Sequence, residues 1–177
     1  MVKIITVPSD TLRKVAKPVE GVDVRILDLL KDMQEILKKA KDPQGVGLAA
    51  TQVGVPLRIF LTRPIKNGAM HTFINPEIIG LSQKTVDPHR KDGVYEGCLS
   101  IPAHFSPIRR SYSVTVKYQV INNGKLSEKI ETFTGFAAHV VQHEMDHLNG
   151  ILFIDRALTQ NAKIYKIEGE EWVEVGI

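Results

Sequence analysis

The chain has 177 residues, 43% of them hydrophobic and 24% charged, which is ordinary for a soluble globular protein of one domain spanning residues 1–177. A formal net charge of +3 without a long basic run gives no indication of nucleic-acid binding. No apolar stretch reaches transmembrane length, and Asp10 follows the N-terminus too soon for a signal peptide. We therefore expect a cytoplasmic protein that does not contact a membrane.

The N-terminal quarter of the chain predicts an amphipathic helix. Residues 1–8 are expected to be extended, and residues 9–11 to form a turn or helix cap. The helix is predicted from about Asp23, a plausible N-cap, to Ala40, with Pro43 ending it. The apolar residues that follow a helical period, and that we expect to face the core, are Val24, Leu27, Leu30, Met33, Ile36 and Leu37.

The middle and end of the chain predict mainly strands. Strands are expected at residues 58–62 and 72–75, joined by a turn at Asn67-Gly68, and residues 82–93 are expected to be a loop. Residues 113–121 alternate polar and apolar, and Asn122-Asn123-Gly124 predicts a hairpin turn to a return strand at about 126–133. Residues 164–175 predict a closing hairpin. The whole order predicts an α+β fold, with antiparallel strands around one late helix.

That late helix carries the motif His143-Glu144-Met145-Asp146-His147 and is expected to end at residues 149–150. In a helix the two histidines lie on one face, one turn apart, so both imidazoles can bind one metal ion. Glu144 can then reach a water on that metal. A helix with two surface histidines is the alternative. The apolar neighbours of the motif favour a buried helix instead, in which the histidines need partners.

Three sources of a third metal ligand can be compared. The metzincin proteases place a histidine where this chain has Phe153, which excludes the ordinary form of that class. A thermolysin-like protease would use a downstream glutamate such as Glu168, but Glu168 and its neighbours Glu170 and Glu171 lie in a polar hairpin. Cys98, the only cysteine, remains as a thiolate ligand suited to zinc or iron. A buried, inert thiol is the alternative for Cys98.

The stretch from Gly45 to Gln52 also matches a loose dinucleotide-binding pattern. We reject that interpretation, because the stretch follows a helix and Pro56 leaves no room for the long helix that such a site requires. Instead, Gly45 and Gly47 are expected to let another backbone approach closely, and Gln52 to offer an amide donor. The alternative is a plain turn with a surface glutamine.

Three stretches together resemble the signature motifs of the peptide deformylase family: Gly45-Val-Gly-Leu-Ala-Ala-Thr-Gln52, Glu96-Gly-Cys-Leu-Ser100 and Gln142-His-Glu-Met-Asp-His147. The resemblance implies a single catalytic domain whose antiparallel sheets pack around a central metal-binding helix. It implies hydrolysis of the formyl group from the N-terminal formyl-methionine of nascent polypeptides, which releases formate. It also implies one divalent ion, usually Fe²⁺ in this family, with Zn²⁺, Ni²⁺ or Co²⁺ as possible substitutes.

The resemblance also implies roles for individual residues. Cys98, His143 and His147 would bind the metal, and Glu144 would be the general acid and base. The Gln52 amide and the Leu99 backbone N–H would stabilise the oxyanion. Apart from the resemblance, Asp146 is expected to face away from the ligand side of the helix and to pair with an arginine, for which Arg110 is the candidate. The residues expected to contact the peptide or its methionine side chain are Gly45, Val46, Gly47, Val94, Gly97, Phe136, His139 and Val140.

Some residues depart from the family pattern. His139 is a polar residue in the expected side-chain pocket, and residues 103–105 lack an arginine that often helps to hold the peptide. A bacterial cytosol is the expected location, with organellar or viral origin left open, and the ribosome is a candidate transient partner. Two alternatives stay open: an endopeptidase with Glu168 as ligand, and a degenerate, non-catalytic binder of peptides or ribosomes. Every expected catalytic position is nevertheless filled.

Overall fold

The computed structural model describes residues 2–40, 44–65, 68–90 and 93–176, so the predictions about Pro43 and Asn67 lie outside the described residues. The helical elements are η1 (Asp10–Arg13), α1 (Val24–Lys39), η2 (Ala50–Val53), α2 (Gly135–Leu148) and α3 (Phe153–Thr159). The strands are β1 (Gly47–Ala49), β2 (Ile59–Thr62), β3 (His71–Leu81), β4 (Thr85–Val86), β5 (Glu96–Cys98), β6 (Ile101–Ser106), β7 (Arg110–Ser111), β8 (Ser113–Asn122), β9 (Lys125–Thr134), β10 (Ile164–Glu168) and β11 (Glu171–Val175).

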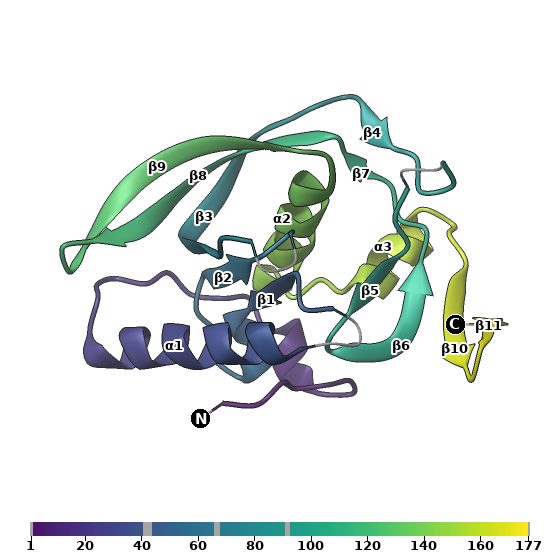
Figure 1. Cartoon of the computed structure of the whole chain (residues 1–177), viewed down its shortest axis with the longest axis horizontal. Coiled ribbons are helices and arrows are strands. Elements are labelled where there is room, and N and C mark those ends of the chain that lie inside the picture. Colours follow the sequence, from purple (N-terminus) through teal and green to yellow (C-terminus); the bar gives the residue numbers. More distant parts are fainter. Residues whose placement is uncertain (1, 41–43, 66–67, 91–92, 177) are drawn as a thin grey trace.

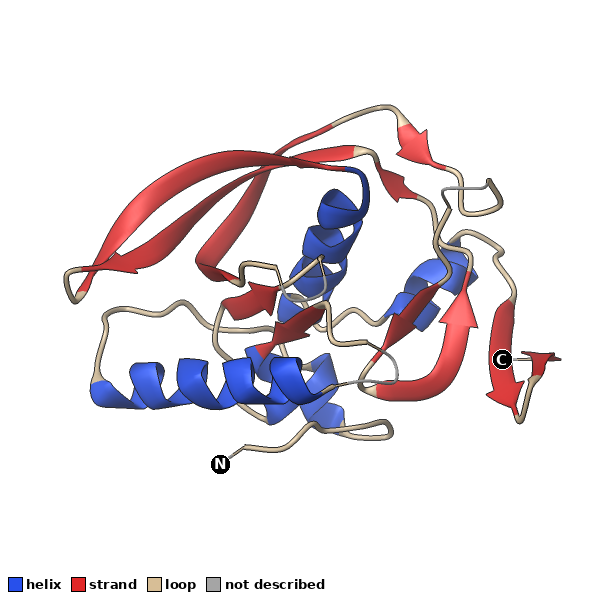
Figure 2. Cartoon of the chain, in the orientation of Figure 1, coloured by secondary structure: helices blue, strands red, loops and turns tan. Residues whose placement is uncertain are grey.

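The strands form antiparallel sheets on either side of α2 (Figures 1 and 2). One sheet has the order β1-β2-β3-β8-β9, the second has the order β11-β10-β6-β5, and β4 pairs with β7. Within the described residues, β1 and β5 are therefore edge strands, each bonded to a single neighbour. This arrangement confirms the predicted α+β fold with antiparallel sheets around a central helix.

Helix α2 lies at the centre of the molecule, and both its apolar and its polar side chains are buried. Every residue from Ala138 to Leu148 is buried. Val141, Met145 and Leu148 pack against aromatic residues of the first sheet, among them Phe60 and Phe73. None of the helices in the described part of the chain is long and apolar enough to span a membrane.

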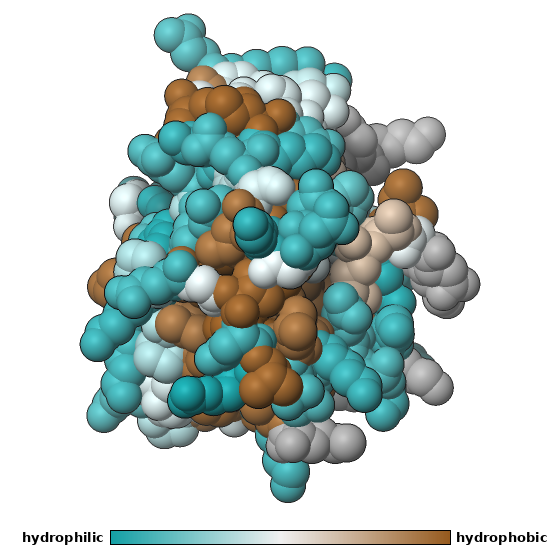
Figure 3. All heavy atoms as spheres, turned by 90° about the vertical axis from the view of Figure 1, so that its left-hand side faces the viewer, coloured by the Kyte–Doolittle hydropathy of each residue, from teal (hydrophilic) through white to brown (hydrophobic). Residues whose placement is uncertain are grey.

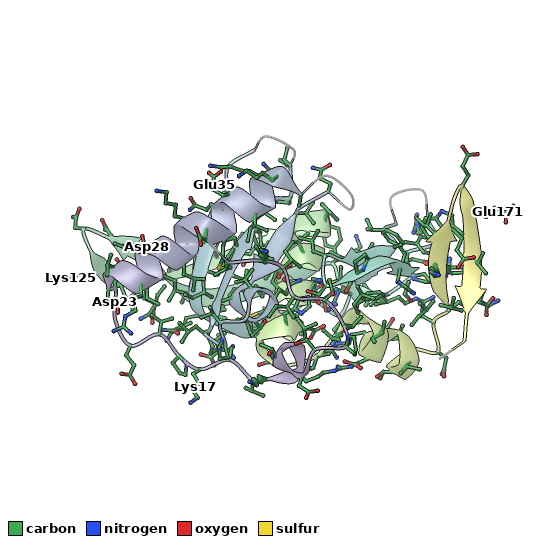
Figure 4. The ribbon with its side chains drawn as sticks, turned by 90° about the horizontal axis from the view of Figure 1, so that it is seen from below. Lys17, Asp23, Asp28, Glu35, Lys125 and Glu171 are labelled. Atoms are coloured by element: carbon green, nitrogen blue, oxygen red, sulfur yellow. The ribbon has the colours of Figure 1, made fainter. Side chains whose placement is uncertain are left out.

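Helix α1 begins where predicted, and the Asp23 side chain accepts a hydrogen bond of 2.9 Å from the Ile26 backbone N–H. Its exposed charged residues include Asp28 and Glu35, which lie along the helix in Figure 4. The predicted apolar face was partly wrong, because Val24 and Leu27 are exposed. The helix carries two overlapping apolar stripes, and the stripe that faces the core consists of Ile26, Leu29, Leu30, Met33 and Leu37.

The hairpin predictions are confirmed for β8–β9 and for β10–β11. Ile121 and Leu126, near the tip of the β8–β9 hairpin, pack against the core cluster beneath α1. Figure 3 views this end of the molecule and shows apolar side chains gathered among hydrophilic ones. The hairpin of β10 and β11 lies at the opposite end, where Figure 4 labels Glu171.

Other strand predictions need correction. Strand β3 continues to Leu81, well beyond the predicted end at residue 75. The predicted loop at 82–93 contains the short strand β4, which pairs with β7. Strands β5 and β6 and helix α3 were not predicted. They are short, and their burial comes from contacts with distant segments rather than from a periodic local pattern.

Gly150 ends α2 at a point of close packing. Its φ angle of 71° is left-handed, and a methyl group there would lie 2.4 Å from the carbonyl oxygen of Arg13. The neighbouring Leu148 carbonyl accepts a hydrogen bond of 2.9 Å from the Ala16 N–H. Gly150 therefore allows the end of α2 to meet the segment that follows η1.

Gly150→Ala is expected to lower the free energy of unfolding by roughly 2–4 kcal/mol, since it combines a strained backbone with a steric clash. Gly124→Ala is the matched control: its φ is also left-handed, at 72°, but nothing lies within 4 Å of the added methyl group. The control should cost only about 1 kcal/mol. Urea-induced unfolding of both variants measures the difference, and equal losses would contradict the importance of the Arg13 contact.

Candidate active site

Helix α2 and strand β5 bring together three side chains that could hold a metal ion. The Sγ atom of Cys98 lies 3.2 Å from Nε2 of His147, and the Nε2 atoms of His143 and His147 lie 3.2 Å apart. All three residues are buried, and their ligand atoms lie within 4.8 Å of one another. Glu168, the alternative ligand, lies on the exposed end of β10, where it pairs with Lys166.

These three residues fit a divalent metal ion. Tetrahedral ligands of an ion that binds nitrogen at roughly 2.0–2.1 Å and sulfur at roughly 2.3 Å lie roughly 3.3–3.6 Å apart. The distances of 3.2 Å from Nε2 of His147 to Cys98 and to His143 are close to that range. One thiolate and two imidazoles also form a donor set that suits iron or zinc. Burial is the main cause that holds the pKa of His147 well below its usual value, and the charge of a protonated His143 lowers this pKa further. The His147 imidazole therefore stays neutral and offers a lone pair.

A buried carboxylate, Glu96, orients the first of the histidines. Its Oε1 atom lies 2.7 Å from Nδ1 of His143, and Arg110 donates two hydrogen bonds of 2.6 Å to the same carboxylate. Burial opposes its ionisation, but Arg110 and then His143 outweigh burial and hold the pKa of Glu96 well below its usual range. The proton on Nδ1 of His143 thus faces Glu96, and Nε2 faces the other ligands.

The predicted pairing of Asp146 with Arg110 is confirmed. Arg110 donates a hydrogen bond of 2.9 Å to Oδ2 of Asp146. Asp146 also accepts hydrogen bonds from Arg156 of α3, at 3.0 Å to Oδ2 and 2.5 Å to Oδ1. The ion pairs therefore form a continuous network from β5 through β7 and α2 to α3.

Glu144 lies beside the ligands and beneath the backbone of β1. Its carboxylate is buried, and within the described residues Oε2 has no hydrogen-bond partner. Burial raises the pKa of Glu144 to about 7. A methyl group on Gly47 would lie only 2.1 Å from Oε1 of Glu144. Glycine at position 47 therefore leaves the space that this carboxylate occupies.

Gln52 is also fixed in the site, by η2. Its Oε1 atom accepts a hydrogen bond of 2.8 Å from the Ala49 N–H. That bond orients the amide so that Nε2 lies 3.4 Å from Sγ of Cys98 and 3.2 Å from Oγ of Ser100. The uncharged donor is therefore buried beside the Cys98 thiol rather than placed at the surface.

These groups open into a cavity of about 560 Å³ between the edge strands β1 and β5. Most of the predicted contact residues line it, together with Cys98, His143, Glu144, Gln52 and Leu99: Val46, Gly47, Val94, Gly97, Phe136, His139 and Val140. Gly45 is not among the lining residues. A methyl group on Gly45 would lie 2.6 Å from the carbonyl oxygen of Leu37, so this glycine allows close packing against α1.

Sequence reasoning missed several residues of the site. Glu96 and Arg156 were not assigned roles, although both belong to the charge network. The one available signal was the charge itself, since Glu96 lies next to Gly97 in a stretch otherwise poor in charged residues. His139 lines the cavity together with Phe136. Its Nε2 atom lies 2.6 Å from Oε2 of Glu96. That contact is not aligned as a hydrogen bond.

Comparison with known proteins gives one consistent result. A family model described as polypeptide deformylase matches residues 1–163. Peptide deformylases of Pseudothermotoga lettingae and Mesorhizobium japonicum are 45% and 44% identical to the chain, covering 88% and 86% of it and 82% and 81% of their own lengths.

Solved structures agree with the sequence comparison. The peptide deformylase of Thermotoga maritima superposes with a TM-score of 0.73 at 39% identity, covering 88% of this chain and 97% of its own. That of Legionella pneumophila gives 0.75 at 35% identity, covering 88% and 85%. The chain therefore belongs to the polypeptide deformylase family, the metal-dependent hydrolases that remove the formyl group from formylated nascent peptides.

Proposed function

We propose that this chain carries out deformylation with Cys98, His143 and His147 as the ligands of one divalent ion, Fe²⁺ in the cell. Zn²⁺, Ni²⁺ and Co²⁺ are the expected substitutes, because all of them accept this set of nitrogen and sulfur donors. The observation that carries the proposal is the convergence of these ligand atoms with Glu144 and Gln52 at one cavity. When bound, the ion supplies Lewis acidity, which acidifies water and stabilises negative charge on the formyl oxygen.

Glu144 is proposed to move the proton. Its carboxylate accepts a proton from the attacking water and then delivers it to the amine that leaves the formyl carbon. A buried carboxyl group whose pKa is raised to about 7 is suited to both steps at neutral pH. The absence of a side chain at Gly47 leaves the space in which this carboxylate lies.

Gln52 and Leu99 are proposed to stabilise the oxyanion that forms on the formyl oxygen. The amide of Gln52 is preorganised by its bond to Ala49, so it donates without reorienting. The backbone N–H of Leu99, beside Cys98 at the cavity, is the second donor.

The peptide is proposed to lie as an added strand between β1 and β5. Both are open edges, so their backbone groups near Gly47 and Gly97 are available for main-chain hydrogen bonds. The methionine side chain would then enter the part of the cavity lined by Phe136, His139 and Val140, with Val46 and Val94 at its margin. Gly45 is proposed to act only indirectly, by allowing the segment before β1 to pack closely against α1.

We further propose that the whole chain, residues 1–177, acts as one catalytic domain in the cytoplasm. Its substrates emerge during translation, so a transient association with the ribosome is proposed. Neither nucleic-acid binding nor a membrane partner is part of the proposal.

Formate release from formyl-Met-Ala-Ser is the direct test. Protein freshly loaded with Fe²⁺ or Ni²⁺ should release formate, and chelation of the metal should abolish the activity. Glu144→Ala should reduce kcat/KM by roughly 10²–10⁴-fold, because the general acid and base is lost. Glu168→Gln, a change at a distant glutamate, should retain wild-type activity. If the freshly loaded wild-type protein released no formate, the proposed function would be wrong.

Cys98→Ala should remove one metal ligand. The Co²⁺-loaded wild type is expected to show a sulfur-to-metal charge-transfer absorption that the variant lacks, and the variant should retain much less metal after dialysis. Glu168→Ala tests the alternative ligand in parallel. Metal that survives the loss of Cys98 but not the loss of Glu168 would refute the proposed ligand set.

Gly47→Ala should displace the Glu144 carboxylate, because the added methyl group occupies its position. We expect kcat/KM to fall roughly 10- to 100-fold, as expected for a displaced catalytic group, while metal content is unchanged. Gly21→Ala, where nothing lies within 4 Å of the new methyl group, is the control and should retain activity. Wild-type activity in Gly47→Ala would contradict the proposed constraint on Glu144.

A further inference from the structure

Four aromatic rings meet beside the cavity, and we call them the aromatic shelf: Tyr95, Phe105, Tyr165 and Trp172. The Trp172 ring centroid lies 5.2 Å from that of Phe105, 5.5 Å from that of Tyr95 and 6.1 Å from that of Tyr165. Trp172 nevertheless remains 49% exposed. The shelf is therefore an assembled aromatic surface that is still open to solvent.

Strand register places the shelf on one face of the second sheet. Phe105 of β6 pairs with Gly97 of β5 on one side and with Tyr165 of β10 on the other, so side chains at these positions point the same way. Tyr95 precedes Gly97 by two residues and shares that face. The β10–β11 hairpin adds Trp172, which pairs with Ile167. The C-terminal hairpin thus completes a surface that begins at the cavity.

The shelf comes closest to the cavity at Gly97. A methyl group there would lie 2.5 Å from the Phe105 ring, so the ring covers the position where a side chain would otherwise stand. Tyr95 and Phe105 both line the cavity. The neighbouring residues of β5, Glu96 and Cys98, are buried on the opposite side, among the ion pairs and the metal ligands.

A peptide strand beside β5 must follow the same alternation. Successive side chains of a strand point to opposite faces of the sheet. If the first side chain enters the pocket near His139, on the Glu96 side of β5, the second side chain points to the other face, where the Phe105 ring covers Gly97. The proposed binding mode therefore directs the second residue of the substrate toward the shelf.

We propose that the aromatic shelf binds the side chain of the second residue of the substrate peptide, and that it favours an aromatic side chain there. The inference rests on the proposed function, since it uses the peptide strand beside β5. Phe105 is the contact residue and Trp172 is a positioning residue that supports the Phe105 ring. Pairing between aromatic rings gives the preference its physical basis.

Formate release from formyl-Met-Phe-Ser and formyl-Met-Ala-Ser tests the proposal. The wild type should prefer the phenylalanine peptide roughly 3- to 10-fold in kcat/KM, the range expected from one aromatic pair. The ratio of kcat/KM for the two peptides should fall toward one in Phe105→Ala and in Trp172→Ala. Phe105→Tyr, which keeps an aromatic ring, should retain the wild-type ratio. The ratio is the readout because a general loss of activity affects both peptides equally.

Val173→Ala is the matched control, since Val173 is partly exposed on the same strand as Trp172 but points to the opposite face. It should keep the wild-type ratio. A wild type without preference, or a ratio unchanged in both shelf variants, would overturn the inference while leaving the proposed function intact. Absence of formate from both peptides would instead refute the proposed function.

Fluorescence provides a readout that does not depend on turnover. Trp172 is the only tryptophan of the chain, so its emission reports on the shelf directly. The unformylated peptide Met-Phe-Ser should change this emission at lower concentration than Met-Ala-Ser, and Phe105→Ala should remove the difference. Identical titrations of the wild type with both peptides would contradict the proposal.

Discussion

The buried carboxylate of Glu96 is the constraint on which the active site depends. A carboxylate is expensive to bury without partners, and removing one partner of such a pair costs roughly 3–5 kcal/mol. Here Arg110 and His143 satisfy the charge from two different elements, β7 and α2. Their bonds fix β5 against α2. Cys98 lies two residues after Glu96. The interaction of Glu96 with His143 therefore orients the His143 imidazole and also places Cys98 beside His143 and His147.

The second half of the network fixes the rotation of α2 about its axis. Arg110 bonds to Glu96 and to Asp146, and Asp146 also binds Arg156, so two guanidinium groups balance two buried carboxylates. Asp146 lies between His143 and His147 in the sequence of α2, one residue before His147. A helix turned by a single residue would rotate about 100° and would separate both Asp146 from Arg110 and the imidazoles from Cys98. Electrostatic pairing and ligand geometry thus select one orientation.

Local signals made part of this structure predictable from the sequence. The Asp23 cap, the Asn122–Gly124 turn and the end of α2 were correct because each depends on neighbouring residues. The proximity of Cys98, His143 and His147, which could hold a metal ion, was expected from the helical spacing of the histidines and from the single cysteine. Strand β5 was missed because three residues give no period, and the role of Glu96 was missed because its partners are 14 and 47 residues away. Such pairings exist only once the sheets and α2 have assembled.

The proximity of Gly47 to Glu144 would link the proposed substrate binding to the proposed acid–base chemistry. The open edge at β1 would bond to the peptide, and its backbone also covers the buried carboxylate. A peptide lying between β1 and β5 would cover the cavity and exclude water, which strengthens the electrostatic interactions within it. Because burial already raises the pKa of Glu144 to about 7, the carboxylate holds a proton with an affinity suited to its transfer. One backbone segment can therefore position the substrate and tune the acid–base group.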